Sequence, residues 1–235
     1  MEKVIVVLQT SNPDDSWCRR LREPVADELL TLGLPGVVLN VCDAPVRNSM
    51  LRISTLTPPA AAVVSVWTHQ YYGDQVRSAV ALLAAESDSA AAYLVTESTP
   101  MPPPDPGNGQ RTPGLANIAF LRRPDWLDHQ SWLRRWHLEH TPVAIETQAT
   151  FGYTQNVVVR ALTDGAPVID GIVEENFPDD AVTDPMAFYG AIDQADLRCR
   201  VERMIASCNT FGAAEGIDTV PTSRYALRSP FWPRG

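Results

Sequence analysis

The stretch TPMPPPDPGNGQRTPG, Thr99 to Gly114, divides the 235-residue chain near its middle. It contains six of the chain's twenty prolines and three of its thirteen glycines. Proline fixes φ and cannot donate a backbone hydrogen bond, so we expect this segment to continue neither a helix nor a strand. The sequence therefore predicts an extended linker over residues 99–114, between one unit at residues 1–98 and another at residues 115–235.

The segment before the linker alternates strand-like and helix-like patterns. Apolar residues spaced for one helix face predict helices at Asp15–Leu32, which Gly33 and Pro35 end, and at Asp74–Ala85. Short β-rich runs predict strands at Val4–Gln9, Gly36–Cys42, Ala61–Thr68 and Ala91–Thr96. The resulting order, βαββαβ, is that of the ferredoxin-like unit.

The segment after the linker repeats this order. We expect helices at Asp128–His140, which Pro142 helps to end, and at Asp184–Ser207, and a tight hairpin turn at Asp164-Gly165. The expected strands are Asn117–Arg122, Thr150–Leu162, Val168–Phe177 and Thr219–Leu227.

Two units of this kind in one chain predict how the whole molecule is built. Each forms an antiparallel sheet with helices on one face, and the bare apolar face needs a cover in water. Two sheets that face each other supply that cover and enclose a cavity. The predicted fold class is therefore α+β, with two ferredoxin-like βαββαβ units in tandem forming a pseudo-dimeric α+β barrel.

Composition narrows the function classes. Hydrophobic residues make up 45% of the chain, charged residues 20%, and the net charge is -9. This composition is typical of a globular protein and disfavours nucleic acid or an anionic membrane as the main partner. The apolar runs are too short to span a bilayer and no signal peptide is evident, so we expect a cytoplasmic protein. Its four cysteines lack CxxC spacing and are expected to be reduced thiols. Exposed sheet edges could pair with those of a second copy, so a homodimer is an alternative to a monomer.

The stretch RRWHLEHTP, Arg134 to Pro142, places two histidines at the end of an amphipathic helix. Trp136 and His140 share the face that should look toward the sheet and the enclosed space, with His137 one step around. A neutral imidazole can remove and return a proton without a cofactor. The alternatives are a structural histidine at the helix end and, less expected without an HExxH spacing, a metal ligand.

Polar residues on the later strands could act with these histidines. Asn156 or Tyr153 could hold a carbonyl or enolate oxygen of a substrate, and Glu174 could orient an imidazole or act as a second acid. The alternative is that they face solvent on a half-exposed strand. Arg122 could pair with a substrate carboxylate or phenolate, or form a surface salt bridge.

The stretch WTHQYYGD places three aromatic side chains at the end of a strand. Period two puts Trp67, His69 and Tyr71 on one side, as a wall for a flat aromatic ligand or as part of the core or an interface. The chain has no GxGxxG or GxxxxGK[ST] phosphate loop, so we expect no nucleotide cofactor.

One segment resembles a known family. FLRRPDWLDHQSWLRRWHLEHTP, residues 120–142, is similar to the EthD family in its strand ending at Arg123-Pro124 and its helix closing in Trp136 and His140-Thr141-Pro142. QNVVVRAL and DGIVEENF, which begin at Gln155 and Asp170, resemble that family's central hairpin.

The resemblance covers residues 117–227, and the first half matches as a divergent copy. It implies the dimeric α+β barrel superfamily, which includes cofactor-free lyases, dehydratases, cyclases, isomerases and monooxygenases acting on aromatic or polyketide-like molecules. We therefore expect a cofactor-independent lyase or isomerase that uses His140 and His137 for acid–base proton transfer. The expected reaction is elimination, isomerisation or decarboxylation of a small hydrophobic, aromatic or polyketide-like metabolite. The alternatives are a monooxygenase of the same superfamily and a non-catalytic binding or assembly protein.

Overall fold

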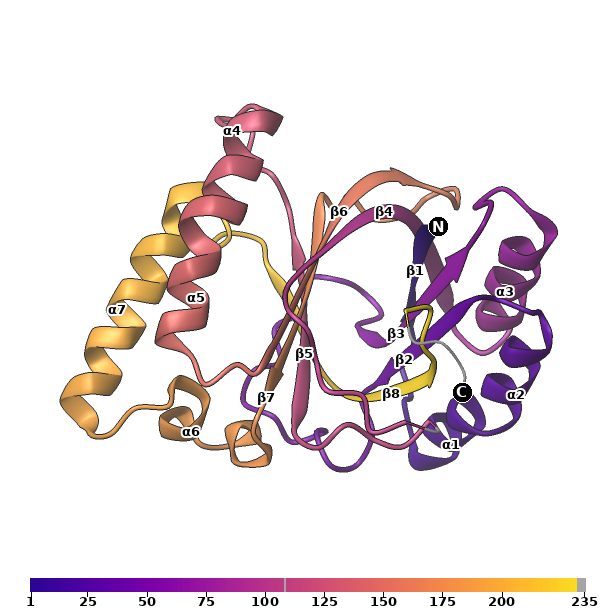
Figure 1. The fold of residues 1–235 in the computed structure, drawn as a ribbon, viewed down its shortest axis with the longest axis horizontal. Helices are drawn as coiled ribbons and strands as arrows, with labels where there is room; N and C mark the ends of the chain where they lie inside the picture. The colour runs from indigo at the N-terminus through magenta and orange to yellow at the C-terminus, as the bar shows by residue number, and fades with distance from the viewer. Residues whose placement is uncertain (108, 232–235) are drawn as a thin grey trace.

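The computed structural model describes residues 1–107 and 109–231. Residue 108 of the proline-rich segment and the last four residues of the C-terminal unit lie outside the described residues. Within the described part, eight strands close into an antiparallel barrel in the order β1-β3-β2-β8-β5-β7-β6-β4. Figure 1 shows the barrel in the centre of the molecule with helices on both sides.

The first half contributes four neighbouring strands in the order β4-β1-β3-β2. Its elements are β1 (Glu2–Gln9), α1 (Asp15–Arg22), α2 (Pro24–Thr31), β2 (Gly36–Val41), β3 (Ala60–Thr68), α3 (Asp74–Ala84) and β4 (Ser89–Met101). The helix expected over residues 15–32 is two helices, because Pro24 lacks an N–H and opens a new helix. The side chain of Asp14 caps the first of them by accepting the backbone N–H of Trp17.

The second half repeats the pattern in the order β8-β5-β7-β6. Its strands are β5 (Leu115–Leu121), β6 (Gly152–Ala161), β7 (Gly171–Phe177) and β8 (Asp218–Arg228). Its helices are α4 (His129–Arg134), the π-helical η1 (Arg135–His140), α5 (Thr141–Thr147), the short 3-10 helix η2 (Asp179–Val182), α6 (Pro185–Tyr189) and α7 (Gln194–Phe211). The two tandem ferredoxin-like units predicted from the sequence are confirmed.

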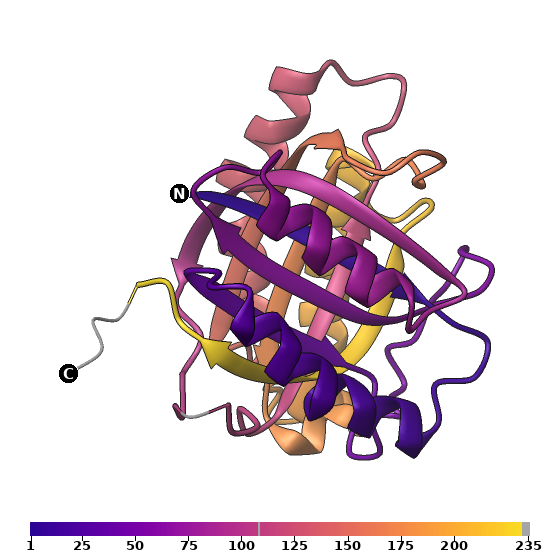
Figure 2. The same ribbon diagram turned by 90° about the vertical axis from the view of Figure 1, so that its right-hand side faces the viewer.

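The two four-stranded sheets join edge to edge through the pairs β2–β8 and β4–β6. The barrel is therefore one continuous sheet with an inside and an outside. Helices α1 to α3 cover the outside of the first half, on the near side in Figure 2, and α4 to α7 cover the second half. None of the described helices has the length and apolar character needed to cross a bilayer.

Alternation along the strands creates three apolar layers. On β1, Ile5 and Val7 join the cluster inside the barrel, whereas Val4 and Val6 join the cluster beneath the first-half helices. A third cluster, which contains Trp132 and Trp136, lies between the second-half sheet and its helices. A side chain's layer is thus set by its parity on a strand.

The proline-rich segment differs from expectation at its start. Strand β4 continues through Thr99 and Pro100 to Met101, which pairs with Tyr153. The register against β6 shifts between Ser98 and Met101, so the ladder can tolerate the missing N–H of proline at this bulge.

The helix expected to end near Pro142 also differs. The helical path continues through α5 to Thr147, and Pro142 lies in its first turn. The preceding turn is π-helical, and the N–H and Oγ1 of Thr141 both donate to the carbonyl of Trp136, five residues earlier. This wider turn lets the helix pass the proline.

Candidate functional site

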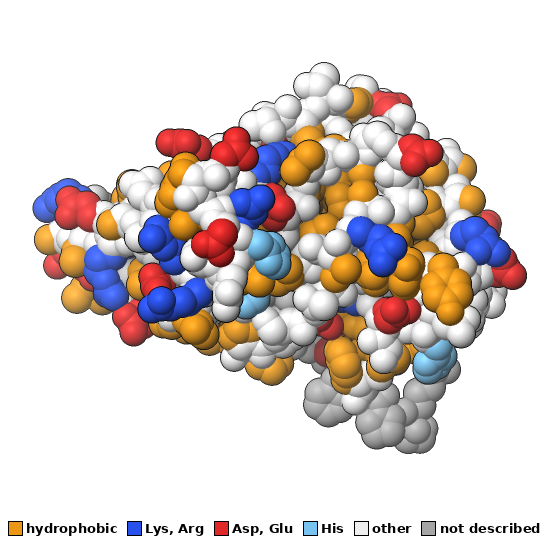
Figure 3. Space-filling model, turned by 90° about the horizontal axis from the view of Figure 1, so that it is seen from above, with side chains coloured by type: hydrophobic (Ala, Val, Ile, Leu, Met, Phe, Trp, Pro, Cys, Tyr) orange, Lys and Arg blue, Asp and Glu red, His pale blue; other side chains and the backbone are white. Residues whose placement is uncertain are grey.

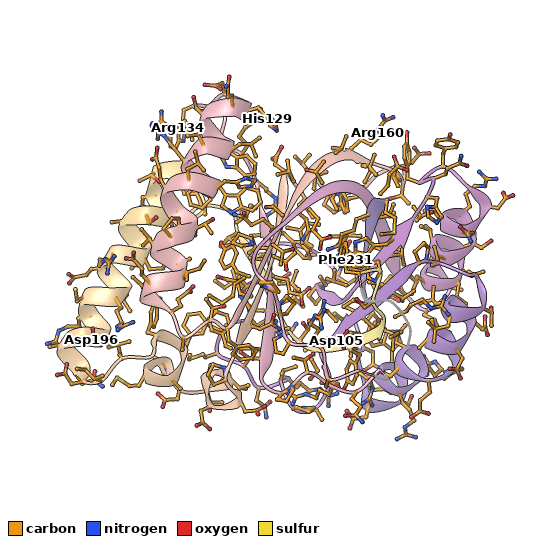
Figure 4. The ribbon with its side chains drawn as sticks, in the orientation of Figure 1. Asp105, His129, Arg134, Arg160, Asp196 and Phe231 are labelled. Carbon is orange, nitrogen blue, oxygen red and sulfur yellow. The ribbon has the colours of Figure 1, made fainter. Side chains whose placement is uncertain are left out.

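A pocket of about 460 Å³ opens at the end of the barrel where β1 begins. Its size is within the range usual for small-molecule sites. Apolar side chains form most of its wall, among them Val38, Trp67, Pro102, Pro103, Ala226 and Phe231. Figure 4 shows Phe231 and Asp105 at this end, facing the viewer over the barrel.

The inner part of the pocket is charged. Lys3, Glu97, Glu174 and Arg224 come from four different strands, and each lines the pocket. All four point inward, because each lies an even number of residues along its strand from a member of the interior apolar cluster. They form two ion pairs, each with one carboxylate and one cation.

The first ion pair joins β1 to β4. Lys3 Nζ lies 2.8 Å from Glu97 Oε1, and Trp67 Nε1 donates to Glu97 Oε2 at 3.1 Å. The same Nζ is 4.6 Å from the centroid of the Trp67 ring. Only 5% of Lys3 is exposed, and this burial lowers the pKa of its ammonium although Glu97 stabilises the charge.

The second ion pair joins β7 to β8. Arg224 Nε lies 2.9 Å from Glu174 Oε1, and Asn40 Nδ2 donates to Glu174 Oε2 at 3.2 Å. Among the residues that the structure describes, neither Glu174 Oε1 nor Arg224 Nε has an aligned hydrogen-bond partner. Both atoms are buried, and the charge of each is compensated by the other across this 2.9 Å contact.

Asn156 lies deeper in the barrel. Its Nδ2 donates to the carbonyl of Ile172 at 3.1 Å, and Ile172 belongs to the interior cluster. Within the described chain, its Oδ1 has no partner. The structure therefore places Glu174 and Asn156 inside the barrel, and Glu174 at the pocket itself.

Trp136 and Tyr153 lie on the other side of the sheet. Both are fully buried in the cluster beneath the second-half helices. Gly171 on β7 makes room for Trp136, because a Cβ at that glycine would come within 2.7 Å of the indole. These two aromatic residues therefore pack the outer layer.

The histidines lie in this outer layer as well. His140 Nδ1 is 3.0 Å from Ser207 Oγ, and the ring centroid is 4.7 Å from that of Phe211, both on α7. His137 is half-buried against Trp136, with ring centroids 4.5 Å apart. Burial lowers the pKa of His137, and that of His140 to about 4.

The expectation that these rings border the enclosed space is wrong. The sheet closes on itself, so the helices lie outside the barrel, and a helix face that looks toward the sheet looks at its outer surface. Figure 4 shows the start of this helix, at His129, well apart from Phe231, which lines the pocket. The second-half helices also carry interspersed arginine and Asp/Glu side chains, on the left in Figure 3, rather than a basic patch.

The other expected binding residues separate from one another. Arg122 forms an ion pair with buried Asp218, 2.6 Å apart, which is the salt-bridge alternative. Strand β3 ends at Thr68, so period two does not extend to the next residues. His69 is exposed, and Tyr71 packs against the outer cluster of the first half, which leaves Trp67 as the member of this trio in the pocket.

Sequence reasoning missed four of the five charged residues that line the pocket: Lys3, Glu97, Asp105 and Arg224. A signal was present for the first. Lys3 is the only lysine in the 235 residues, and the other 18 of the 19 Lys and Arg residues are arginine. It also stands directly before the apolar run Val4–Leu8, where a charge on the inner face of a strand would be buried.

Comparisons with known proteins support the fold. No protein-family model and no curated protein sequence matches the chain. A solved anthrone oxidase-like protein superposes with a TM-score of 0.56 at 10% identity, covering 99% of this chain and 96% of that one. The EthD family stays a prediction, while the dimeric α+β barrel fold is confirmed.

Two further structures are similar over nearly the whole chain. A proposed monooxygenase from Lactobacillus acidophilus gives a TM-score of 0.49 at 10% identity, covering 97% of this chain and 96% of that one. A chlorite dismutase from Candidatus Nitrospira defluvii gives a TM-score of 0.46 at 13% identity, with coverages of 96% and 91%.

Proposed function

We propose that the protein is an enzyme that removes a proton from a small, flat, hydrophobic metabolite held in the barrel pocket. The observation that carries this proposal is an apolar pocket whose inner end consists of two ion pairs that are mostly removed from solvent. A low-polarity wall with a few convergent charged groups is typical of ligand and active sites.

Glu174 is the proposed base. Its side chain lines the pocket, with Asn40 donating to Oε2 and Arg224 paired with Oε1. A carboxylate in that position can take a proton from a carbon next to a substrate carbonyl. The guanidinium of Arg224 can then stabilise the enolate oxygen, as fixed donors do for developing negative charge.

The aromatic residues at the mouth would hold the ring system. Trp67 and Phe231 lie with ring centroids 6.1 Å apart in an edge-to-face arrangement, and both line the pocket. A flat aromatic or polyketide-like substrate would pack against Trp67 with its carbonyl directed at the charged end.

The next step of the enolate determines which of the reactions expected from the sequence takes place. Return of the proton at another carbon gives isomerisation, and loss of a leaving group gives elimination, both without a cofactor. The same enolate could instead react with O₂, which is the monooxygenase alternative. We therefore propose a cofactor-independent lyase or isomerase, with an oxygenase as the second candidate.

This assignment moves the proposed chemistry away from the histidines. His137 and His140 were expected to transfer the proton, but they lie across the sheet from the pocket. Glu174, which was expected to assist them, becomes the central residue.

The proposal can be tested with bicyclic aromatic ketones such as α-tetralone in D₂O, by measuring deuterium entry at the carbon next to the carbonyl with NMR. The wild-type protein should accelerate exchange, and Glu174→Gln should lower the rate by roughly 10²–10⁴-fold. Glu175→Gln is the matched control, because that neighbouring carboxylate faces the helices, and it should retain the rate.

Equal rates for Glu174→Gln and the wild-type protein would remove Glu174 as the base. If the wild-type protein accelerates exchange with none of the bicyclic aromatic ketones, the proton-abstraction proposal itself is contradicted. A parallel measurement of O₂ consumption separates the two candidates, since the oxygenase consumes O₂ and forms oxygenated product only in air.

A further inference from the structure

The chain's single lysine lies in the pocket. Its cations elsewhere are arginines, including those of exposed ion pairs such as Arg20–Glu86 and Arg203–Glu146. Arginine pairs well with carboxylates but keeps its proton, whereas a buried lysine can become a neutral amine. The one place where this chain uses lysine is thus a place where a neutral amine could meet a ligand.

The surroundings of Lys3 favour a reactive amine. Its Nζ is buried in the pocket, 4.6 Å from the centre of the Trp67 ring and 2.8 Å from Glu97 Oε1. Burial lowers the pKa of Lys3, as the neighbouring Arg224 also does, and Glu97 and Glu174 act in the opposite direction. A proton acceptor at hydrogen-bond distance and an apolar wall are the features that activate lysine for nucleophilic attack.

We propose that Lys3 forms a Schiff base with the carbonyl carbon of an aldehyde or ketone substrate bound in the barrel pocket. This inference rests on the proposed function and names its substrate class. It also gives Glu97 a role that is distinct from that of Glu174.

The step balances within the ion pair. A proton moves from the Lys3 ammonium to Glu97, and the neutral amine attacks the carbonyl carbon, so that a C–N bond forms and the C=O π pair moves to oxygen. Glu97 protonates that oxygen and then takes a proton from nitrogen, which gives the carbinolamine. Glu97 returns this proton to the hydroxyl, the C–O bond breaks and water leaves. The product is a protonated imine, and Glu97 is a carboxylate again.

The protonated imine would assist the proposed base. Its positive nitrogen withdraws electrons from the neighbouring carbon, so a C–H bond there loses its proton more readily than in the free carbonyl compound. Lys3 and Glu174 both line the pocket, and they could thus act on the same substrate from different strands.

Reductive trapping on the intact wild-type chain tests the amine directly. The protein is incubated with 2-naphthaldehyde and sodium cyanoborohydride, and fragmentation mass spectrometry compares the label on Lys3 with that on the Met1 amine. Met1 is 62% exposed and serves as an internal standard. The ratio of Lys3 to Met1 label should be roughly tenfold or more above that of the urea-unfolded chain, since the pocket holds the ring beside the amine.

A matched competitor shows whether the pocket is responsible. An excess of 2-naphthalenemethanol, which has the same ring but no carbonyl, should lower the label on Lys3 and leave that on Met1 unchanged. Label on Met1 alone, or a Lys3 ratio no higher than in the unfolded chain, would overturn the inference.

A charge-preserving variant separates this inference from the proposed function. Lys3→Arg keeps a cation beside Glu97 but cannot form an imine, so it should abolish α-tetralone exchange in a protein that circular dichroism shows to be folded. Retained exchange in Lys3→Arg, with exchange lost in Glu174→Gln, would reject the Schiff base and leave proton abstraction in place. If the aldehyde is trapped on Lys3 but no ketone exchanges, the Schiff base is supported and proton abstraction is rejected. If the variant does not fold, the wild-type trapping decides.

Discussion

Two adjacent glutamates on β7 lie in opposite environments. Glu174 points into the barrel, with Arg224 2.9 Å away and Asn40 donating to it. Glu175 points outward into the helix layer, where burial raises the pKa of its carboxyl to about 7. With its amide oriented to satisfy its neighbours, Gln148 donates to Glu175 Oε1 at 3.2 Å. On the inner face the charge of Arg224 compensates that of Glu174, whereas on the outer face the neutral amide of Gln148 bonds Glu175.

The two faces also use tryptophan differently. Trp67 lines an open pocket and shares its Nε1–H with Glu97, while Trp136 is completely buried among apolar neighbours beneath the helices. The barrel interior therefore contains charged groups beside open space, whereas the helix layer is filled by packed apolar side chains. Substitutions on the helix side should therefore change stability, and substitutions in the barrel should change ligand binding.

The largest effect is expected from Trp136→Ala. Removing a fully buried indole leaves a cavity beneath the helices and should lower the free energy of unfolding by about 3–5 kcal/mol. Trp67→Ala should cost less, because that ring already borders open space, but it should weaken binding of 2-naphthol. Urea unfolding and fluorescence titration of both variants measure the two quantities.

The opposite pattern would erase the distinction between the faces. If Trp136→Ala weakened 2-naphthol binding at unchanged stability, the ligand would sit in the helix layer. If Trp67→Ala left binding unchanged, the barrel pocket would not hold the ring.

The sequence predicted the strands and their order because those signals are local. Alternating and β-branched runs, such as Val4–Gln9 and Ala61–Thr68, mark strands wherever they pair, and the repeated βαββαβ order then limits the topology. One long-range prediction that the structure confirmed, that the two apolar sheet faces cover each other, follows from the same patterns.

The direction of the faces could not be predicted in the same way. Every residue of β7 is buried, and so is every residue of β5, because both sides of these strands are covered. Polar alternation therefore cannot tell inside from outside there, and the histidines were assigned to the wrong side. The turn that passes Pro142 depends on a π-helical bond to Trp136, which no spacing rule reveals.

The stability of the fold should depend on pH through Glu175. Tyr153 on β6, Tyr189 on α6 and Cys208 on α7 face Glu175, and burial raises the pKa of each of these three groups, which keeps them neutral near pH 7. Glu175 has a folded pKa of about 7 against an ordinary value of 4.5, so the folded chain holds its proton longer. Its contribution is fully present below pH 4.5 and is lost as the pH rises through 7.

Glu175→Gln should remove this pH-dependent loss of stability, because the glutamine amide has nearly the same shape as the carboxyl group but does not ionise. At pH 8 the variant should be more stable than the wild-type protein by up to about 3 kcal/mol, and the two should converge near pH 4.5. Urea unfolding at several pH values measures the difference. A constant difference at all pH values would show that Glu175 does not retain its proton in the fold.

The smallest effect on catalysis is expected from His140→Gln. The ring packs on Phe211 and bonds Ser207 across the sheet from the pocket, so ketone exchange should stay within error of the wild-type rate. Its folded pKa of about 4 is below the usual 6.5, so its contribution to stability is present above pH 6.5 and is lost as the pH falls through 4. The variant should therefore unfold less readily in acid relative to its own stability at neutral pH. A large fall in exchange with unchanged acid unfolding would instead assign the proton transfer to His140, on the helix side of the sheet. Glu174 would then have a structural role only.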